Sequence, residues 1–351
     1  MIKHFRNLLG LSFALFLTLS LSAQEQAYKV GLLGFYNLEN LFDTIDTPDV
    51  NDTEFSPAGA KNYNGRLYYD KLNNLSRVIS ELGTDMSPDG VSMLGVAEIE
   101  NRSVLEDLVS QESIADRNYQ IVHYDSPDRR GIDVGLLYNP KYFTVTESRA
   151  VPLMIYELNG EDRIYTRDIL LVGGLYDGEP LYVMVNHWPS RRGGEAASAR
   201  LRNAGALVCK NLSDSLRTAI PNVKIVIMGD LNDDPTSPSV AQVLAAQGKK
   251  NKVRKGGFYT PMWEFFRKGM GSNAYRDAWS LFDQLILSDN FLDENQKGYR
   301  FYQAYIYNPN YLIQKNGHFV GYPFRTFAGD AYLGGYSDHF PVYMAILKPV
   351  N

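Results

Sequence analysis

Two adjacent residues near the end of the chain, Asp338 and His339 in the segment SDHFPV, place a carboxylate beside an imidazole. They come just before the apolar run 342–347, which predicts a buried strand. A carboxylate at a strand end can bind a hard cation, and an imidazole can donate or accept a proton near neutral pH. An adjacent Asp-His pair is common by chance, so its meaning depends on what else the chain brings to the same place.

Three further polar residues follow apolar segments. Glu98, in GVAEIEN, suits a hard cation such as Mg²⁺. The alternative is a carboxylate that favours the start of a following helix, a role that Glu100 would fill equally well. Asp230 and Asn232, in MGDLNDDP, can together orient an attacking water and a phosphate oxygen. The alternative there is an ordinary turn, because Asp and Asn favour turns.

A histidine and a further carboxylate complete the candidates. His187, in VNHWPSR, closes an apolar segment just before Arg191 and Arg192, which predicts a proton donor in an anion-binding site. The alternative is an exposed histidine at a strand end. Asp283 begins the apolar segment of FDQLILS, and a buried carboxylate needs a partner, for which His339 is the candidate. The sequence contains no H-E-x-x-H, paired C-x-x-C, G-x-S-x-G, P-loop or G-x-G-x-x-G motif.

Alternating strand and helix patterns must position these side chains. Early strands alternate with helices, and later strands resemble hairpins, which predicts mixed sheets covered by outer helices. No linker divides the chain, so a single domain is expected. Strands are predicted at 30–36, 91–97, 119–124, 134–138, 169–176, 181–185, 223–228, 282–288 and 341–347, and helices at 69–82, 100–111 and 194–217.

Composition is that of an ordinary globular protein. The chain has 351 residues, 44% hydrophobic and 21% charged, which is enough to bury a large core. Its formal net charge of −5 disfavours tight, non-specific nucleic-acid binding, although it does not exclude a phosphodiesterase with a metal-screened site. The single cysteine, Cys209, excludes an intrachain disulfide and fits a core position in a helix.

The first segment, residues 1–23, has the pattern of a secretory signal peptide. Lys3 and Arg6 precede an apolar stretch that ends in Leu21-Ser22-Ala23. The alternative is a short membrane anchor, but the apolar run is short for a span. We therefore expect an exported protein, periplasmic or extracellular, whose mature domain covers residues 24–351 and contains no membrane span.

Taken in order, eight motifs resemble the endonuclease/exonuclease/phosphatase superfamily, which includes pancreatic-type deoxyribonuclease, neutral sphingomyelinases and inositol polyphosphate phosphatases. Each motif is weak alone, but all eight occur in the family's order between residues 30 and 347. The resemblance implies an α/β fold, a two-sheet sandwich with helices on both outer faces. The motifs are FYNLENLF, GVAEIEN, RRGIDVGLLYNP, TRDIL, VNHWPSR, MGDLNDDP, FDQLILS and YSDHFPV.

The same resemblance implies metal-dependent phosphoester hydrolysis. Glu98 resembles the principal Mg²⁺ ligand, with Asn37 and Asp338 nearby. Asp230 resembles the residue that orients or deprotonates the attacking water, and Asn232 resembles its phosphate-positioning partner. Mn²⁺ and Ca²⁺ are alternative metals.

The remaining roles concern the phosphate and the leaving group. Asp283 and His339 resemble a carboxylate–imidazole pair that stabilises transition-state charge. His187 resembles a second histidine that donates a proton to the leaving oxygen. Asp133 is its expected partner, and the alternative for Asp133 is an ordinary surface position in a strand. Arg167 resembles a phosphate-contacting arginine.

A second phosphate contact is expected at Arg191, in the basic pair after His187. Residues 289–336, rich in Tyr and Phe, form an insertion before SDHFPV. One interpretation is a loop packed on the sheet edge, and the other is a lid or specificity wall beside the site. Arg325 in this insertion is a further candidate phosphate contact.

The leading hypothesis is an exported, monomeric, Mg²⁺-dependent phosphodiesterase, a nuclease that acts on extracellular DNA or RNA. One alternative is a hydrolase of a smaller phosphoester, such as a nucleotide, an inositol phosphate or a sphingomyelin-like lipid. Another alternative is an inactive binding module on the same fold. That alternative predicts that some of the catalytic residue types are missing, and the sequence contains all of them.

Overall fold

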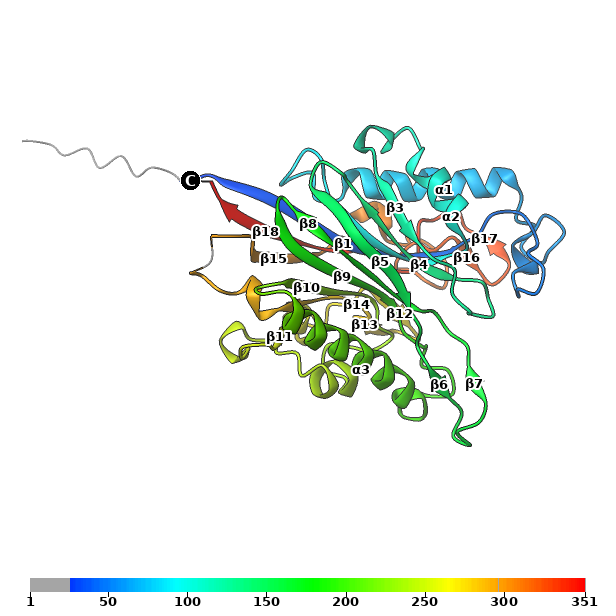
Figure 1. Cartoon of the computed structure of the whole chain (residues 1–351). Coiled ribbons are helices and arrows are strands. Elements are labelled where there is room, and N and C mark those ends of the chain that lie inside the picture. Colours follow the sequence, from blue (N-terminus) through cyan, green and yellow to red (C-terminus); the bar gives the residue numbers. More distant parts are fainter. Residues whose placement is uncertain (1–25, 296, 351) are drawn as a thin grey trace, which may run out of the picture.

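Two six-stranded sheets lie face to face in the computed structural model, which describes residues 26–295 and 297–350. The predicted signal peptide, residues 1–23, lies outside the described residues. Helices cover the outer side of each sheet, with α1 and α3 on opposite sides of the molecule (Figure 1). The predicted fold class, a two-sheet α/β sandwich with helices outside, is confirmed.

The first sheet combines the beginning and the end of the chain. Its central β1 pairs in parallel with β2 and antiparallel with the last strand, β18. The strand order is β15 (Arg300–Ile306), β18 (Val342–Pro349), β1 (Tyr28–Leu41), β2 (Met93–Ile99), β4 (Asp133–Tyr138) and β3 (Gln120–His123).

The second sheet contains the middle of the chain. Its β8 and β9 form a hairpin around the Asp177–Gly178 turn, and β9 pairs in parallel with β10. The strand order is β11 (Phe258–Tyr259), β14 (Asp283–Ser288), β10 (Lys224–Asp230), β9 (Glu179–His187), β8 (Ile169–Tyr176) and β5 (Phe143–Val151).

Shorter elements complete the described chain. The helices are α1 (Gly65–Glu81), α2 (Arg102–Val109), α3 (Glu195–Ala219) and α4 (Met262–Arg267). Single helical turns span Thr53–Phe55, Ala115–Arg117, Ser239–Val243, Lys250–Lys252, Asp289–Phe291 and Asn310–Leu312. Three two-stranded ribbons are β6 (Ile155–Tyr156) with β7 (Arg163–Ile164), β12 (Asn273–Tyr275) with β13 (Ala278–Ser280), and β16 (Phe327–Ala328) with β17 (Ala331–Tyr332).

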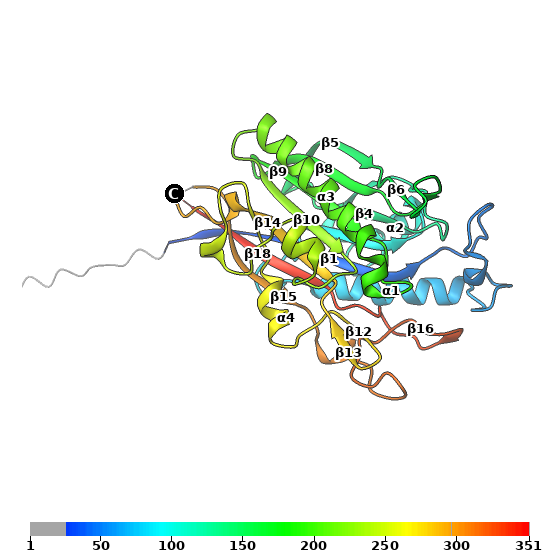
Figure 2. The ribbon, with the colours of Figure 1, turned by 90° about the horizontal axis from the view of Figure 1, so that it is seen from below.

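Strand β10 shows why the sandwich has two apolar layers. Val226 and Met228 belong to the core between the sheets, whereas Ile225 and Ile227 belong to the layer under α3. This alternation follows from the two-residue period of a strand. Because both faces are buried, β10 is apolar almost throughout, and α3 covers its outer face with buried residues that include Cys209 (Figure 2).

Helix α1 begins at a side-chain cap and packs by its apolar stripe. The Asn64 side chain accepts hydrogen bonds from the backbone N–H groups of Arg66 and Leu67, which satisfies donors that the first turn leaves free. Leu72, Leu75 and other residues at helical spacing are fully buried in the main core.

The aromatic insertion packs along the sandwich instead of enclosing a separate space. Part of it is β15, the edge strand beside β18. The hydroxyl groups of Tyr307 and Tyr311 donate to Glu81 of α1 at 2.9 and 2.8 Å. Within the described residues, no helix has both the length and the apolar character that crossing a bilayer requires.

Candidate metal and phosphoester site

The first sheet brings two polar side chains to one end of the sandwich, where β1 and β2 leave their regular pairing. Asn37 pairs with Ala97, after which the register shifts and leaves Glu98 on a bulge. Glu98 has a φ of 59°, a left-handed conformation that is costly for a residue with a side chain. Its Oε2 accepts a hydrogen bond from the Asn40 backbone N–H at 3.1 Å, which fixes the direction of the carboxylate.

The second sheet presents three side chains in register at the same end. Asp230, the last residue of β10, is directly opposite His187 on one side and Asp283 on the other. Gly229 precedes it because any side chain would collide there: an added Cβ would lie 2.1 Å from the Asn186 carbonyl oxygen. The carboxyl ends of β9 and β10 therefore meet the amino end of β14.

The loop before β18 adds the Asp-His pair. The Ser337 hydroxyl donates to the Asn37 carbonyl oxygen at 2.7 Å and accepts from the His339 backbone N–H at 3.1 Å. These two bonds tie the loop to the end of β1, 300 residues away in sequence. His339 is therefore held over the second sheet by a contact with the first.

Asp230 lies at the centre of the contacts between the two sheets. Its Oδ2 accepts a hydrogen bond from Asn37 Nδ2 at 3.0 Å and lies 3.6 Å from His187 Nε2 and 3.9 Å from His339 Nε2. His187 Nε2 is also 3.8 Å from Glu98 Oε1. The structure thus brings together side chains from four strand ends and one loop.

A divalent cation fits the cluster of Glu98, His187 and Asp230. Each offers one ligand atom, and the three atoms lie within 4.8 Å of one another. Two carboxylates and an imidazole form a donor set suited to Mn²⁺ or Mg²⁺. The predicted ligands Asn37 and Asp338 stay predictions; Asn37 directs its amide N–H to Asp230, and its Oδ1 accepts from the Glu39 backbone N–H at 2.9 Å.

Asp338, the third predicted metal ligand, lies at the rim of this cluster. Its side chain is 32% exposed, 4.0 Å from His339 Nε2 and 3.6 Å from the Arg325 guanidinium. Arg325 is thereby placed beside a carboxylate of the site. Residues 289–336 therefore border the site through Arg325, while most of the aromatic side chains pack elsewhere.

The two histidines have opposite charge preferences. Burial opposes protonation of His339, but the Asp283 carboxylate 2.6 Å from Nδ1 overcomes this and raises the pKa of His339 well above its ordinary value. Burial, together with the positive charges of Arg167 and Arg130, holds the pKa of His187 well below its ordinary value. These opposite shifts favour the protonated form of His339 and the neutral form of His187, so proton donation suits His339 better than the predicted donor, His187.

Asp230 has the environment of a group that can take up a proton. Burial raises the pKa of Asp230 to about 6, against the opposing effect of the His339 cation. Its Oδ1 accepts a hydrogen bond from the Asn232 backbone N–H at 2.9 Å. The Asn232 side chain donates to the Trp188 carbonyl oxygen at 2.8 Å, and its backbone φ of 49° is left-handed.

Arg167 mainly braces the strand that carries His187. Three of its N–H groups donate, to the carbonyl oxygens of His187 and Trp188 at 3.0 and 2.7 Å and to Asp128 at 2.9 Å. An arginine has five such N–H groups, so the predicted phosphate contact rests on the other two. Arg167 does line the cavity described below.

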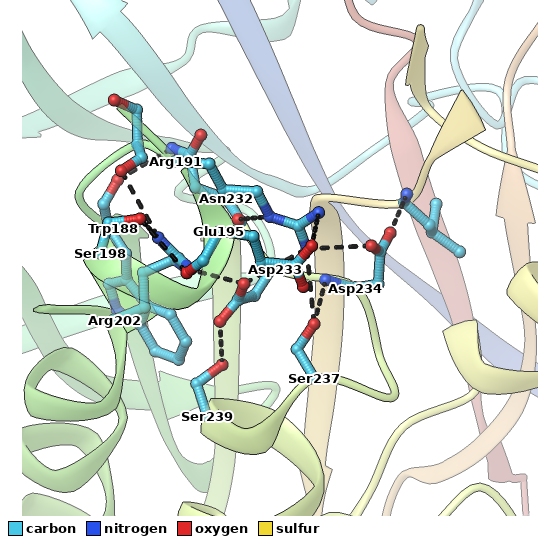
Figure 3. A network of polar contacts seen from close by, with 12 residues as sticks. Trp188, Arg191, Glu195, Ser198, Arg202, Asn232, Asp233, Asp234, Ser237 and Ser239 are labelled. Atoms are coloured by element: carbon cyan, nitrogen blue, oxygen red, sulfur yellow. Dashed lines mark hydrogen bonds and ion pairs between the residues drawn. The ribbon is translucent and has the colours of Figure 1, made fainter. Parts of the chain in front are cut away.

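Arg191 occupies a different place from the predicted phosphate contact, which we correct. Its guanidinium donates to the Asn232 carbonyl oxygen at 3.0 Å, to Asp234 at 3.0 Å and to Glu195 at 3.2 Å (Figure 3). It also lies over the Phe282 ring, 4.6 Å from its centroid. Arg191 therefore holds the loop that carries Asn232, and it is not among the residues that line the cavity.

A buried ion pair anchors the same loop to α3. The fully buried Arg202 has Nε 2.7 Å from Asp233 Oδ1, and its NH1 donates to Ser198 at 2.9 Å (Figure 3). Asp233 Oδ2 accepts from the Ser239 hydroxyl at 2.7 Å. These contacts preorganise the segment that follows Asp230, and the sequence did not single out Arg202 or Asp233.

The expected partner of His187 is wrong. Asp133 contacts His123 Nε2 at 3.0 Å and accepts from the Ser126 backbone N–H at 2.8 Å. His187 Nδ1 is buried with no hydrogen-bond partner among the described residues. The Asp133 carboxylate is instead engaged by His123 of the neighbouring strand β3 and by Ser126.

A buried lysine and a carboxylate behind the site were also missed. Burial and the nearby Asp338 raise the pKa of Glu39 to about 7, and its Oε2 accepts from the Thr326 backbone N–H at 2.6 Å. Lys71 of α1 donates to the Thr326 hydroxyl at 2.7 Å, and burial lowers its pKa. The only sequence signal for Glu39 is its place two residues after Asn37.

One cavity of about 910 Å³ opens onto these residues. Glu98, His187, Asp230, Asn232 and His339 line it, together with side chains from the β6–β7 ribbon and the start of α3. No described residue of 289–336 lines this cavity, and the contacts of Tyr307 and Tyr311 with Glu81 fit the packed-loop interpretation; a specificity wall beside the site stays a prediction.

Comparison with known proteins identifies relatives of the whole chain. The sequence profile described as the Endonuclease/Exonuclease/phosphatase family matches residues 32–348. A search of curated protein sequences finds no match. Several solved structures have a fold similar to that of this chain, although their sequence identity to it is below 25%.

Three of these structures share nearly the full length. D. rerio TDP2 complexed with a single-strand DNA product is 14% identical, with a TM-score of 0.53 over 90% of this chain and 98% of that chain. An endonuclease/exonuclease/phosphatase family protein from Bacteroides thetaiotaomicron is 13% identical, with a TM-score of 0.53 over 93% and 100%. A mannosyl-6-phosphatase from the same species is 14% identical, with a TM-score of 0.52 over 92% and 100%.

The profile match covers both sheets and every side chain of the cluster at the sandwich end. The site geometry agrees with phosphoester hydrolysis, because it combines candidate metal ligands, a carboxylate that can accept a proton and a cationic imidazole. The chain belongs to the endonuclease/exonuclease/phosphatase family of phosphoesterases.

Proposed function

We propose that this protein is an exported, Mg²⁺-dependent phosphodiesterase that cleaves single-stranded nucleic acid. The observation that carries the hydrolytic part is the position of Asp230 between Asn37 of the first sheet and two histidines of opposite charge preference. Two observations support a nucleic-acid strand as the substrate. The structural relative D. rerio TDP2 was solved with a single-strand DNA product, and several arginines line the cavity of this chain.

The chain's own residues supply the proton transfers. A water oxygen attacks phosphorus while its proton passes to the buried carboxylate of Asp230. The bond from phosphorus to the leaving oxygen breaks, and that oxygen takes the proton of cationic His339, which Asp283 stabilises. Asn37 and the Asn232 backbone hold Asp230 in place throughout.

A divalent cation held by Glu98, His187 and Asp230 would neutralise charge on the non-bridging phosphate oxygens. Mg²⁺ is the proposed ion because two carboxylates dominate the set, with Mn²⁺ favoured by the imidazole.

The test is hydrolysis by the purified protein with Mg²⁺, Mn²⁺, Ca²⁺ or chelator. We expect cleavage of single-stranded DNA or RNA with Mg²⁺ or Mn²⁺ and none with chelator. If single-stranded DNA and RNA both stay intact while small phosphoesters are hydrolysed, the proposed nuclease activity is wrong. If no phosphoester is hydrolysed with any metal, the whole proposal is wrong.

A small phosphoester is the second candidate, and the cavity favours it. A volume of about 910 Å³ is in the range of small-molecule sites, and one structural relative is named a mannosyl-6-phosphatase. Sugar phosphates, nucleotides and sphingomyelin in the same assay separate the two candidates.

Export is proposed from residues 1–23 alone. The mature amino terminus should follow Ala23, and amino-terminal sequencing of protein from the extracytoplasmic fraction tests this. An intact Met1 on all of the protein would contradict it.

A further inference from the structure

The cavity extends well beyond the catalytic cluster, to a set of guanidinium groups that the reaction at one phosphorus does not use. We call Arg129, Arg130, Arg163 and Arg192 the arginine rim, and all four line the same cavity as Asp230 and His339. Three separate segments supply them: the turn before β4, strand β7, and the loop before α3.

The β6–β7 ribbon forms the outer part of this wall. It projects from the sandwich at the end opposite the carboxyl terminus (Figure 1). Arg163 is paired across the ribbon with Tyr156, and its guanidinium lies over the Tyr165 ring, 4.9 Å from the centroid. The ribbon is thus a short arm that carries a cation to the edge of the cavity.

Carboxylates of the described chain neutralise the other arginines nearby but leave the rim largely free. Arg167 pairs with Asp128 at 2.9 Å, and Arg200 pairs with Glu157 at 3.3 Å. Of the rim, only Arg130 has a carboxylate within 4.0 Å, and that is Asp128 at 3.7 Å, already shared with Arg167.

One further carboxylate lines the cavity, and it does not change this balance. The Asp162 side chain accepts a hydrogen bond from the Asn159 amide at 2.8 Å. Arg163 Nε is buried without a hydrogen-bond partner among the described residues, and a buried polar group without a partner is costly. Among the described residues, Arg129, Arg163 and Arg192 have no carboxylate within 4.0 Å, so with Arg130 they form an anion-binding wall in a chain whose net charge is −5.

We propose that the arginine rim binds a second phosphate group of the substrate, so that preferred substrates carry a phosphate beside the one that is hydrolysed. The inference rests on the proposed phosphoester hydrolysis and adds the substrate class to it. Two sources share this chemistry: the neighbouring phosphate of a nucleic-acid strand and the second phosphate of a small bisphosphate. In this proposal, the charge of the arginine rim determines the substrate specificity. The sequence pattern instead suggested the aromatic insertion, residues 289–336, as a specificity wall.

The experiment compares matched substrates that differ by one phosphate. Glucose 1,6-bisphosphate against glucose 6-phosphate represents the small-molecule source, and dithymidine monophosphate with and without a 5′-phosphate represents the strand. We expect kcat/KM to be at least about tenfold higher for the two-phosphate member of one pair, which identifies the source. Equal kcat/KM within both pairs would refute phosphate binding by the arginine rim, while the proposed phosphoester hydrolysis would still stand.

Variants assign that preference to the rim. Arg163→Gln should reduce the two-phosphate preference by at least about threefold, and the double variant Arg130→Gln/Arg163→Gln should bring it to within about twofold of equal kcat/KM. Arg200→Gln is the matched control, because Glu157 already neutralises it, and its preference should stay within twofold of the wild type. A preference that survives the double variant would overturn the proposal.

A binding measurement keeps the two proposals separable. Calorimetric titration of the metal-free protein with each two-phosphate compound should show tighter binding than with its one-phosphate partner, and Arg163→Gln should weaken only the former. If no substrate is hydrolysed but this pattern holds, the rim stands and the proposed function fails. If binding is equal for both members of each pair and for the variant, the rim is wrong whatever the activity.

Discussion

Replacing Asp283 by Asn removes a charge without changing the size of the side chain. Asp283 is fully buried at the start of β14, and its Oδ2 lies 2.6 Å from His339 Nδ1. The carboxylate keeps His339 protonated, since it raises the pKa of the imidazole against the effect of burial. We expect the Asp283→Asn variant to fold and to lose most of its activity at neutral pH.

The magnitude follows from the bond that is lost. A hydrogen bond to a charged group is worth about 1.5–3 kcal/mol. If the transition state depends on the cationic imidazole, kcat should fall by about 10- to 150-fold, at 1.36 kcal/mol for each factor of ten. The pKa of His339 should fall at the same time, so the alkaline limit of the kcat–pH profile should move to lower pH.

The assay is the kcat–pH profile between pH 5 and 10 with saturating Mg²⁺, accompanied by circular dichroism. Asp289→Asn is the matched control. Asp289 lies in the turn just beyond the far end of β14, and its side chain accepts from the Gly256 backbone N–H at 2.8 Å. A folded Asp283→Asn enzyme with kcat within threefold of the wild type and an unmoved alkaline limit would refute the assigned role of the pair.

The other predictions concern metal, base, stability and pH. Glu98→Gln should raise the Mg²⁺ concentration for half-maximal activity at least about tenfold in a metal titration; an unchanged value would remove Glu98 from the ligand set. Asp230→Asn should abolish hydrolysis while the thermal unfolding temperature is retained, and normal turnover would exclude Asp230 as the base. Arg202→Met should lower the free energy of unfolding by about 1.5–3 kcal/mol in urea, because Asp233 loses its buried arginine and keeps only Arg191 at 3.3 Å and the Ser239 hydroxyl; a loss under about 0.5 kcal/mol would contradict this. Burial raises the pKa of Glu100 from 4.5 to about 7, so its stabilising contribution is complete below its unfolded pKa and is lost as pH rises through 7. Glu100→Gln should therefore raise the unfolding temperature at pH 8.5 but not at pH 5, and an equal effect at both pH values would refute it.

Much of the fold could be predicted from local patterns. The apolar run of β10 and the hairpin of β8 and β9 follow from strand periodicity and turn residues, and the structure confirms them. Helix α1 begins at Gly65, four residues before the predicted start, because Asn64 supplies a cap that the apolar periodicity does not reveal. Such boundary differences are expected where a cap determines the first turn.

The candidate site was predictable only as a set of residue types. Asp283 and His339 were expected to meet, and the structure places them 2.6 Å apart. Arg191 and Asp133 were assigned by closeness in sequence or by resemblance, and the structure places them in other networks. Side-chain direction at a strand end depends on register and on bulges, which local sequence determines weakly.

The sequence by itself determined which residues stand at strand ends and what chemistry they can do, because period-two alternation and turn residues are local properties. Only the tertiary structure decided which of them touch. The bond between Asn37 and Asp230 joins residues 193 apart, across two sheets whose packing is a property of the whole core. The opposite charge preferences of His187 and His339 likewise arise from burial and neighbouring charges, which no spacing along the chain records.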